Sequence, residues 1–441
     1  MKKSSFQQYQ NRKALCIYGL IDLLIPPFLL GLIHFCFDGG PWTKSYCYLA
    51  TLSGLFFFLG TAFQGGYSRY NERCISKKLE ITFKTWFFTV FLLMAVSYFY
   101  LVILNFDRFI MTASVILTPF IVVSLKIFVN SLNRKLSKNK IVIAVLGRNY
   151  QFNEHEQAML TSQSIELTYI DFNEIDTLQT TIEEITPDYL LLNLEKPANE
   201  KLIKNLTHIN LKGTRVIQLY HFMEAFLRKC YIPYDQQDLS YLDNIRRYNA
   251  TKYSLKRIID WSAVLILGIL SIPVILISAY KIKKESPGKI FFRQSRVGVE
   301  GESFQAIKFR SMHENAKFDP YTQKKDPRIF PFGNFMRKSR IDELPQLWNV
   351  AKGEMHLLGP RTEWDILVEN YEKEIPYYHE RHLVRPGISG WAQVLYPYGA
   401  NTEDARQKLM YDLYYIKHWS IWLEMETLIR TISVVLGKKG L

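Results

Sequence analysis

Long apolar runs dominate the first third of the chain and predict membrane-spanning helices. Four of them follow one another closely, over residues 14–37, 46–63, 86–106 and 109–129. Each approaches the roughly 20 residues that a helix needs to cross the hydrocarbon layer of a bilayer. Four such runs in succession, with Trp and Tyr near several of their ends, favour membrane spans over buried helices of a soluble domain. We therefore predict a four-helix transmembrane bundle over residues 1–135.

Positive charge between these runs indicates the orientation of the bundle. Lysine and arginine are frequent before the first run, between the second and third runs, and after the fourth run. The other two loops hold only Lys44 and Arg108. Under the positive-inside rule, both ends of the bundle then face the cytoplasm, and the rest of the chain follows on that side.

A different pattern begins near residue 140 and predicts an α/β domain. The short β-branched or leucine-rich runs KIVIAVLG, IELTYID, DYLLLNL and TRVIQLY are separated by polar stretches long enough for helices. This alternation is typical of about four parallel strands joined by helices in a doubly wound, Rossmann-like sheet. We assign residues 136–250 to this domain.

The predicted α/β domain lacks the glycine fingerprint of a dinucleotide site. A pyrophosphate-binding turn needs several glycines at fixed spacing, whereas VLGRNYQFNE offers only Gly147. Asp171 ends the second predicted strand, where a ribose-binding acid lies in such domains, but one acid alone is weak support. A structural, regulatory or dimerising domain is therefore favoured over a cofactor site, and we expect a homodimer.

A fifth apolar run, over residues 257–280, is long enough to span a bilayer but has lysines and arginines on both sides. This distribution favours keeping both of its ends in the cytoplasm. Pro273 would remove a backbone hydrogen bond and bend a helix, and the Ser271 hydroxyl could bond a freed carbonyl. We predict a broken, re-entrant helix hairpin that enters and leaves the membrane through one face.

Composition limits the chemistry. The formal net charge of +14 suggests a polyanionic partner, but much of it lies beside the apolar runs, so nucleic acid is not expected as a partner. Five cysteines without CxxC spacing, none in the last two hundred residues, argue against a disulfide framework, a thiolate zinc site and a C-terminal cysteine nucleophile. For His379 and His382, a helix-surface pair is favoured over a metal site.

Basic residues beside glycines and aromatics recur in the last third of the chain, in FFRQSRVGVEG, FQAIKFRSM, FMRKSR, LLGPR and VRPGISGWAQV. Arginine offers a planar fork of donors that suits phosphate oxygens, although a solvated basic surface is the alternative. Arg337, Arg361 and Arg385 each lie beside residues expected at turns or element ends, as a convergent phosphate pocket would require. Lys308 and Arg310 are further phosphate-binding candidates.

Two adjacent acids, Asp342 and Glu343, stand directly before an apolar run in IDELPQLWNV. Because Pro345 fits only the first turn of a helix, we expect a helix with Asp342 as its N-cap that ends at Gly353. On this local pattern alone, a capping role is favoured over a catalytic one.

The segment from Lys256 to about residue 437 resembles the bacterial sugar transferases, which move a hexose-1-phosphate from a UDP-sugar to a polyprenyl phosphate. The matching motifs are KRIID, SPGKIFFRQSRVGVEGESFQAIKFRSM, RKSRIDELPQLWNVAKGEM, LLGPR, RPGISGWAQV and DLYYIKHWSIWLEMETLIRTI. Four spans and an α/β insert are similar to the large polytopic members, which include undecaprenyl-phosphate glucose and galactose phosphotransferases. We assign residues 251–441 to a mainly α, membrane-associated phosphoglycosyl transferase domain.

The resemblance implies roles for the candidate residues. Asp342 would be the nucleophile that attacks the β-phosphorus of a UDP-hexose, releases UMP and holds a covalent phosphosugar. Glu343, with Asp342, would bind Mg²⁺, and Arg337, Arg361 and Arg385 would bind phosphate. A helix start would keep these carboxylates ionised and attract phosphate.

The resemblance also implies partners and a location. The partners would be a UDP-hexose, undecaprenyl phosphate and a lipid bilayer. The multi-pass protein would act at the cytoplasmic face of a bacterial inner membrane and start an exopolysaccharide, capsule or O-antigen repeat. The alternative is a membrane-anchored nucleotide-sensing regulator or scaffold of polysaccharide synthesis.

Three residues depart from the family pattern. Ile272 precedes the hairpin proline where Ser is usual, His356 replaces a small Ser, and Thr362 replaces a proline. All three are expected near the nucleotide pocket. In the tail, Trp419, Trp422 and Leu423 are expected either in the membrane interface or in the protein core.

Overall fold

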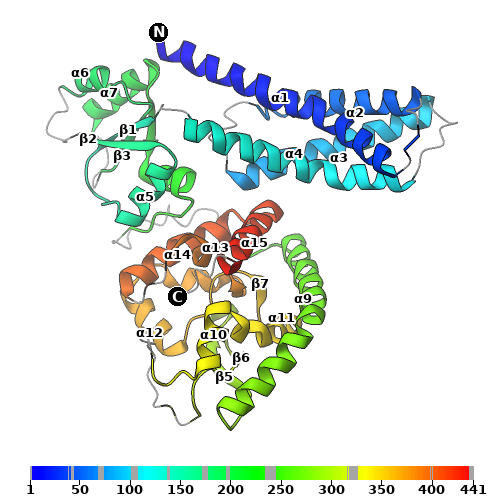
Figure 1. Cartoon of the computed structure of the whole chain (residues 1–441). Helices are drawn as coiled ribbons and strands as arrows, with labels where there is room; N and C mark the ends of the chain where they lie inside the picture. The colour runs from blue at the N-terminus through cyan, green and yellow to red at the C-terminus, as the bar shows by residue number, and fades with distance from the viewer. Residues whose placement is uncertain are drawn as a thin grey trace. The chain divides into compact units, whose positions relative to one another are not determined.

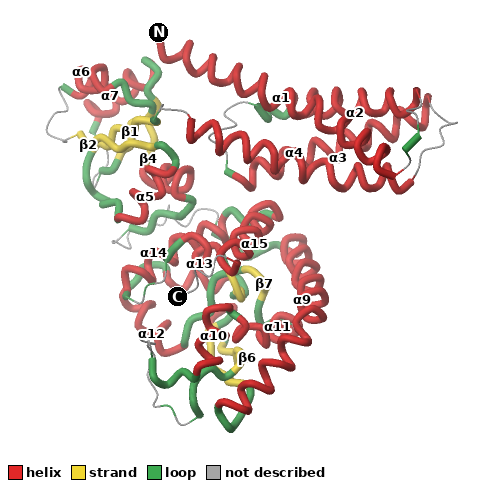
Figure 2. The backbone as a smooth tube through the Cα atoms, in the orientation of Figure 1, coloured by secondary structure: helices red, strands yellow, loops and turns green. Residues whose placement is uncertain are grey.

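The protein is described from a computed structural model (Figures 1 and 2). The structure describes residues 2–37, 39–40, 44–67, 74–100, 108–136, 140–170, 177–194, 199–233, 245–314, 316, 326–397, 399 and 401–436. The chain divides into two compact units, Met1–Ile141 and Val142–Leu441. The predicted end of the bundle, residue 135, lies close to this boundary, and the predicted border at residues 250/251 falls inside the second unit.

The first unit contains the predicted bundle helices. They are α1 (Lys2–Phe37), α2 (Lys44–Phe63), α3 (Ile75–Tyr100) and α4 (Arg108–Leu136). The predicted apolar runs lie in these helices, except for residues 101–106, which lie outside the described residues. Helix α3 begins at Ile75 rather than at the predicted Trp86. Ion pairs within its polar first turns stabilise this extra helix: Lys77 Nζ lies 3.0 Å from Glu80 Oε2, and Lys84 Nζ lies 2.6 Å from Glu80 Oε1.

A buried ion pair joins α1 to α4. Lys126 Nζ donates to Asp22 Oδ2 at 2.6 Å, and the Tyr67 hydroxyl donates to the same oxygen at 2.7 Å. Both charged side chains are buried. Because an unpaired charge is costly in hydrocarbon, this pair specifies which faces of α1 and α4 meet.

Five helices of the described residues are long and apolar enough to cross a membrane, namely the four bundle helices and α9 (Ala250–Glu285). Helix α9 differs from the others in its exposure, because only 11% of its most apolar window is buried. These helices identify a membrane protein.

The four predicted strands all form and lie in one sheet of order β2-β1-β3-β4. They are β1 (Ile141–Leu146), β2 (Ile165–Ile170), β3 (Tyr189–Leu192) and β4 (Arg215–Gln218). Strands β1 and β3 are parallel, as are β3 and β4. In Figure 1, helices α6 (Leu178–Ile185) and α7 (Glu200–Leu211) lie on one side of the sheet, and α5 (Glu154–Ser162) lies on the other.

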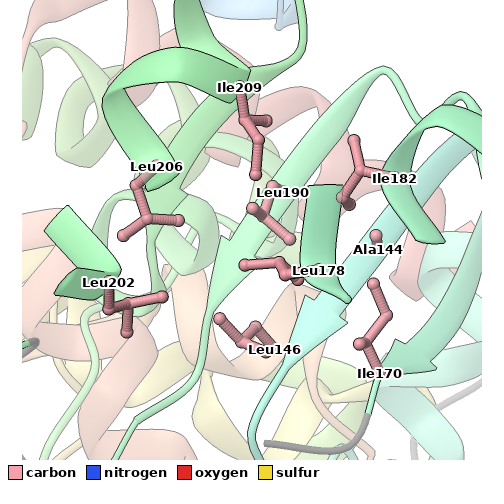
Figure 3. Close-up of a cluster of buried hydrophobic side chains, with 9 residues drawn as sticks. All are labelled: Ala144, Leu146, Ile170, Leu178, Ile182, Leu190, Leu202, Leu206 and Ile209. Carbon is pink, nitrogen blue, oxygen red and sulfur yellow. The ribbon is translucent and has the colours of Figure 1, made fainter. Parts of the chain in front are cut away.

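The core of this domain lies between the sheet and helices α6 and α7 (Figure 3). It consists of Ala144, Leu146, Ile170, Leu178, Ile182, Leu190, Leu202, Leu206 and Ile209. Fully burying one such leucine or isoleucine contributes roughly 1.5–3 kcal/mol relative to leaving it exposed. This apolar contact fixes the positions of the loops at the strand ends.

The carboxyl edge of the sheet is closed at the point where doubly wound domains bind nucleotides. With this strand order, that crevice lies between β1 and β3. There the Asn193 side chain accepts from Tyr150 N at 2.9 Å and donates to Tyr150 O at 2.8 Å. Gly147 has φ of +90°, and a Cβ at this position would lie 2.4 Å from Asn193 O. Hydrogen bonds and backbone of the domain itself therefore occupy this point, and its role as a structural, regulatory or dimerising domain stays a prediction. Asp171 lies outside the described residues.

The C-terminal part of the second unit is mainly helical. After α9 it contains β5 (Phe291–Val297), β6 (Ser303–Phe309), α10 (Pro331–Ser339), the 3₁₀ helix η6 (Ile341–Gln346), α11 (Leu347–Lys352), β7 (His356–Leu358), α12 (Asp365–Glu374), the 3₁₀ helix η7 (Tyr378–Leu383), β8 (Gly387–Ser389), α13 (Trp391–Leu395), α14 (Thr402–Lys417) and α15 (Ile421–Leu436). Strands β5 and β6 form an antiparallel hairpin, and β7 pairs in parallel with β8.

The predicted break in the fifth apolar run is not seen. The predicted hairpin, residues 257–280, lies within the single helix α9, and Pro273 is inside that helix. The Ser271 hydroxyl donates to Gly268 O at 3.0 Å, next to the carbonyl whose partner Pro273 removes. A proline that removes one hydrogen bond can thus be kept in a long helix without dividing it.

Both ends of α9 are bonded to the same C-terminal domain. Near its start, Lys256 Nζ lies 2.8 Å from both Leu358 O and Glu424 Oε1. At its end, Arg310 Nη1 donates to Ser286 Oγ at 2.7 Å. The apolar side chains in between, such as Leu265, Ile269, Leu270 and Leu276, are exposed.

The structure decides between protein core and membrane interface for two of the three tail residues, whereas Trp422 is half-buried. Trp419 and Leu423 are buried, and the Trp419 indole donates to Glu424 Oε2 at 2.8 Å. These two residues therefore belong to the protein core rather than to a membrane interface. Ile429 and Ile432, further along α15, are exposed.

Candidate active site

The β5–β6 hairpin presents two basic side chains on one face. Phe292 pairs with Lys308, and Arg296 pairs with Phe304. Residues that pair directly across an antiparallel hairpin lie on the same face, and so do residues separated by an even number along one strand. Lys308 and Arg296 therefore point to the same side of the hairpin.

The two acids lie in a tight helical turn that follows α10. Arg340 ends α10 with φ of +57°, a left-handed conformation that is uncommon for a residue with a side chain. The chain then winds as η6 and continues as α11, which ends at Gly353 as predicted. The predicted N-cap is wrong: Asp342 lies inside η6 and its side chain makes no cap, because the helical turn already begins at Ile341.

Glu343 is buried among three basic side chains. Its Oε1 lies 3.1 Å from Lys308 Nζ, 3.2 Å from Arg361 Nη2 and 3.7 Å from Arg340 Nη1. Burial by itself would raise the pKa of Glu343, but these cations outweigh burial and hold the pKa well below its ordinary value. Glu343 is therefore ionised at neutral pH and links η6 to β6 and to the loop after β7.

Asp342 has a different environment from its neighbour. Its Oδ1 is buried and has no hydrogen-bond partner in the part of the chain that the structure describes. Burial and the charge of Glu343 raise the pKa of Asp342, whereas Lys308, Arg337 and Arg340 act in the opposite direction. The net direction is upward, because burial and the charge of Glu343 outweigh these three cations.

Three of the five predicted phosphate-binding residues lie with the acids. Lys308 and Arg361 contact Glu343 directly, and Arg337 is one of the cations whose charge acts on Asp342. The structure therefore brings together residues from β6, α10, η6 and the loop after β7.

The other two predicted residues have different partners. Arg310 is buried, and its guanidinium donates to Lys289 O at 2.6 Å and to Ser286 Oγ at 2.7 Å. Its donors hold the end of α9, so Arg310 is not retained as a phosphate-binding candidate. Arg385 bonds the Tyr253 hydroxyl and lies over the Tyr253 ring at 5.0 Å, near the start of α9.

Arg296 and Arg340 belong to the site but were not singled out in the sequence. Arg296 Nη1 donates to Thr362 O at 3.2 Å, next to Arg361. Burial lowers the pKa of Arg296 to about 10, while the charge of Glu363 acts against this shift. Both arginines lie inside quoted basic motifs, but local pattern does not separate them from the neighbouring basic residues.

The departure at position 356 has a structural partner. His356 is buried, and its Nδ1 lies 2.6 Å from Asp260 Oδ2 of α9. Burial lowers the pKa of His356, so the neutral ring donates to the carboxylate. His356 thus joins β7 to α9, and its ring also contacts Tyr253 at 6.2 Å.

The donor set fits a magnesium ion better than a transition metal. Among the described residues there is no cluster of three or more His, Cys, Asp or Glu side chains that could hold a metal. Mg²⁺ commonly uses only one or two carboxylates and completes its coordination with substrate phosphates and water. Glu343 and Asp342, whose Oδ1 has no partner in the described parts of the chain, supply such a pair of carboxylates. The predicted surface position of the two histidines is right for His379, which is exposed and bonds Glu372, and wrong for His382, which is buried.

Comparisons with known proteins match the C-terminal domain most strongly. The family profile described as bacterial sugar transferase matches residues 251–438. The UDP-N-acetylgalactosamine-undecaprenyl-phosphate N-acetylgalactosaminephosphotransferase of Aeromonas hydrophila is 46% identical over 188 residues, which are 42% of this chain and 44% of that protein. The UDP-glucose:undecaprenyl-phosphate glucose-1-phosphate transferase of Xanthomonas campestris pv. campestris is 43% identical over 172 residues, 38% of this chain and 36% of that protein.

A longer match covers more than this domain. The chain spans less than half the length of the two relatives above. The UDP-galactose-lipid carrier transferase of Erwinia amylovora is 30% identical over 352 residues, which cover 70% of this chain and 71% of that protein. The similarity therefore extends beyond residues 251–438 to most of both sequences. This chain belongs to the bacterial sugar transferase family.

Proposed function

We propose that this protein is a phosphoglycosyl transferase that moves a hexose-1-phosphate from a UDP-sugar to undecaprenyl phosphate. One observation carries the proposal: Asp342 presents a buried carboxylate oxygen without a partner among the described residues, beside Glu343, which Lys308 and Arg361 neutralise. An acid in this setting can act as a nucleophile toward a phosphate that the nearby cations attract. The names of the relatives, which specify UDP-sugars and an undecaprenyl or lipid carrier, support the substrate classes.

In the first step, an Asp342 carboxylate oxygen attacks the β-phosphorus of the UDP-sugar. A bond forms between this oxygen and phosphorus, the bond from that phosphorus to the bridging oxygen breaks, and UMP leaves with that oxygen. Lys308, Arg337 and Arg361 would hold the diphosphate oxygens and stabilise the charge that develops on UMP. The intermediate is a hexose phosphate bonded to Asp342.

In the second step, an oxygen of undecaprenyl phosphate attacks the same phosphorus. The bond to Asp342 breaks, the carboxylate is restored, and the product is a polyprenyl diphosphate sugar. No proton is needed by the leaving carboxylate, because it departs as an anion. The same cations would neutralise both reacting phosphates, which otherwise repel each other.

Magnesium is a proposed cofactor of this site. Glu343 and Asp342 are the residues that would hold Mg²⁺, with the substrate phosphates as further ligands. When bound, the ion would offset the negative charge of the diphosphate. Because Glu343 is already ionised, it is available as a ligand without losing a proton.

Helix α9 offers a way to bring the site to the lipid substrate. Its two ends bond to one domain through Lys256 and Ser286, while its middle exposes apolar side chains. A helix that crossed a bilayer would place its ends on opposite sides, so these contacts favour both ends of this single helix on one side of the membrane, with its exposed apolar middle in contact with lipid. We propose that this face is cytoplasmic, and that the reaction takes place at headgroup level at a bacterial inner membrane. The homodimer also stays a proposal, which light scattering of the detergent-solubilised protein would test.

The experiment is an assay of UMP release in membranes that contain the protein. The donor panel is UDP-glucose, UDP-galactose and their N-acetylated forms, with undecaprenyl phosphate and Mg²⁺. We expect UMP and a lipid-linked sugar from at least one donor, and loss of both in Asp342→Asn. Glu369→Gln, on the exposed side of α12, is the matched control and should keep full activity. No UMP from any donor, or full activity of Asp342→Asn, would contradict the proposal and favour a regulator or scaffold.

A further inference from the structure

A buried ion pair between η7 and α14 lies next to the candidate site. Arg381 of η7 donates from Nη2 to Asp412 Oδ2 of α14 at 2.8 Å. Both side chains are buried, with 5% and 1% of their surface exposed. Arg381 Nη1 also donates to the Tyr378 hydroxyl at 2.5 Å. The orientation of the guanidinium is thus fixed by two partners.

The same guanidinium reaches the main chain of an active-site residue. Arg381 Nη2 donates to Arg361 O at 2.8 Å. The Arg361 side chain in turn contacts Glu343 at 3.2 Å. At the residue before Arg361, the chain is also bonded to β8, because Gly387 N donates to Pro360 O at 2.8 Å. The backbone that carries Arg361 is therefore held between β8 and Arg381.

The energetics of this pair favour a role in positioning over a role in stability alone. Moving two charges out of water costs several kcal/mol per ion, and apolar residues of similar volume often stabilise a protein equally well. The pair is also incompletely satisfied, because Asp412 Oδ1 is buried without a hydrogen-bond partner among the described residues. An apolar replacement could not donate a hydrogen bond to the Arg361 carbonyl, whereas the planar guanidinium of Arg381 donates to it at a fixed angle.

We propose that Arg381, held by Asp412 and Tyr378, is a positioning residue that places Arg361 against Glu343 and the substrate phosphates. This inference rests on the proposed function. A displacement of about 1 Å at a reacting group can reduce the rate about 100-fold. Replacing Arg381 should therefore lower kcat/KM through Arg361, without removing any group that touches the substrate.

The test is a double-mutant cycle on kcat/KM for UMP release, with the full-length protein in membranes. The variants are Arg381→Lys, Arg361→Lys and the double variant. Lysine keeps a positive charge beside Asp412 but cannot bond all three acceptors in the arginine geometry. We expect about a 100-fold loss in Arg381→Lys, and no further loss when Arg381→Lys is added to Arg361→Lys.

A matched control comes from another buried arginine of the same domain. Arg406 of α14 is 3% exposed, and its Nη2 donates to Ile232 O at 2.5 Å. Arg406→Lys removes comparable contacts without touching Arg361, so its effect should multiply with that of Arg361→Lys. If the effect of Arg381→Lys also multiplies, it acts independently of Arg361 and the inference is overturned.

Two further results keep the test decisive. If Arg381→Lys does not fold, as judged by its melting temperature in detergent, Tyr378→Phe removes only the acceptor hydroxyl and enters the same cycle. A multiplicative effect of Tyr378→Phe would equally overturn the inference. An inactive wild-type protein would remove the proposed function together with this inference, whereas an active wild type with a multiplicative cycle would remove the inference alone.

Discussion

Lys229 and Glu156 form a buried contact that tests what the α/β domain does for the C-terminal domain. Lys229 Nζ bonds the Glu156 carboxylate of α5 and donates to Gln407 Oε1 of α14 at 2.6 Å. The Tyr150 hydroxyl donates to Glu156 Oε1 at 2.6 Å. The side chains of Lys229 and Glu156 are 0% and 1% exposed. Lys229 thus joins helix α5 of the α/β domain to α14 of the C-terminal domain through one buried ion pair and one hydrogen bond.

The size of the effect follows from this burial. Lys229→Met would leave the Glu156 charge buried without a cation, which typically costs 3–5 kcal/mol. Burial already lowers the pKa of Lys229, although Glu156 acts against the shift, as expected where desolvation is only partly offset. Adding Glu156→Gln removes the uncompensated charge, and a glutamine at this N3 position can keep the hydrogen bond to Asn153 N. The double variant should therefore lie only about 1 kcal/mol below the wild type.

The assay is urea unfolding of the detergent-solubilised protein, followed by tryptophan fluorescence. Lys212→Met is the matched control, because Lys212 pairs with Glu183 at 2.6 Å in the same domain but both side chains are at least half exposed. Such an exposed pair contributes less than about 1 kcal/mol. The reasoning is refuted if Lys229→Met costs no more than Lys212→Met, or if Glu156→Gln fails to recover most of the loss.

Two other residues give separate tests of the α/β domain. Burial would raise the pKa of Glu224, but hydrogen bonds from His418 and Lys417 lower it to about 2. This stabilisation is present above the ordinary pKa of 4.5 and is lost as the pH falls from 4.5 to 2. Glu224→Gln should therefore lower the free energy of unfolding by up to about 3 kcal/mol at pH 7. At pH 3 the difference between this variant and the wild type should be smaller. Equal differences at the two pH values would contradict this prediction. Gly147→Ala should lower the free energy of unfolding in urea by more than about 2 kcal/mol. The alanine would have to adopt a left-handed φ and place its Cβ against Asn193 O. A loss below about 1 kcal/mol would contradict this loop conformation.

The strands and most helix positions can be predicted from the sequence because burial leaves a periodic signal. Parallel strands that are covered on both faces read as continuous apolar runs, as residues 141–146 do. The sequence pattern does not predict the start of α3 or the continuity of α9, because the periodic apolar signal is interrupted at both places. Polar residues and one proline interrupt the apolar pattern there, yet the backbone stays helical.

The site is only partly predictable, because partners depend on tertiary contacts. Lys308 and Arg310 stand two positions apart in one basic motif, yet one contacts Glu343 and the other holds the end of α9. No local feature distinguishes them. Arg381 and Asp412 are far apart in the sequence and share no motif spacing, so their pairing emerges only from the packing of η7 against α14.

The central claim is that Asp342 forms a covalent bond to the transferred phosphosugar. The most direct measurement incubates the purified protein with an active UDP-sugar, radiolabelled at the β-phosphate, and Mg²⁺ without undecaprenyl phosphate. Peptide mass spectrometry then locates the label. The account predicts a hexose phosphate on the peptide that contains Asp342, its loss on addition of undecaprenyl phosphate, and no label in Asp342→Asn. Label on another residue, or label retained in Asp342→Asn, would contradict it.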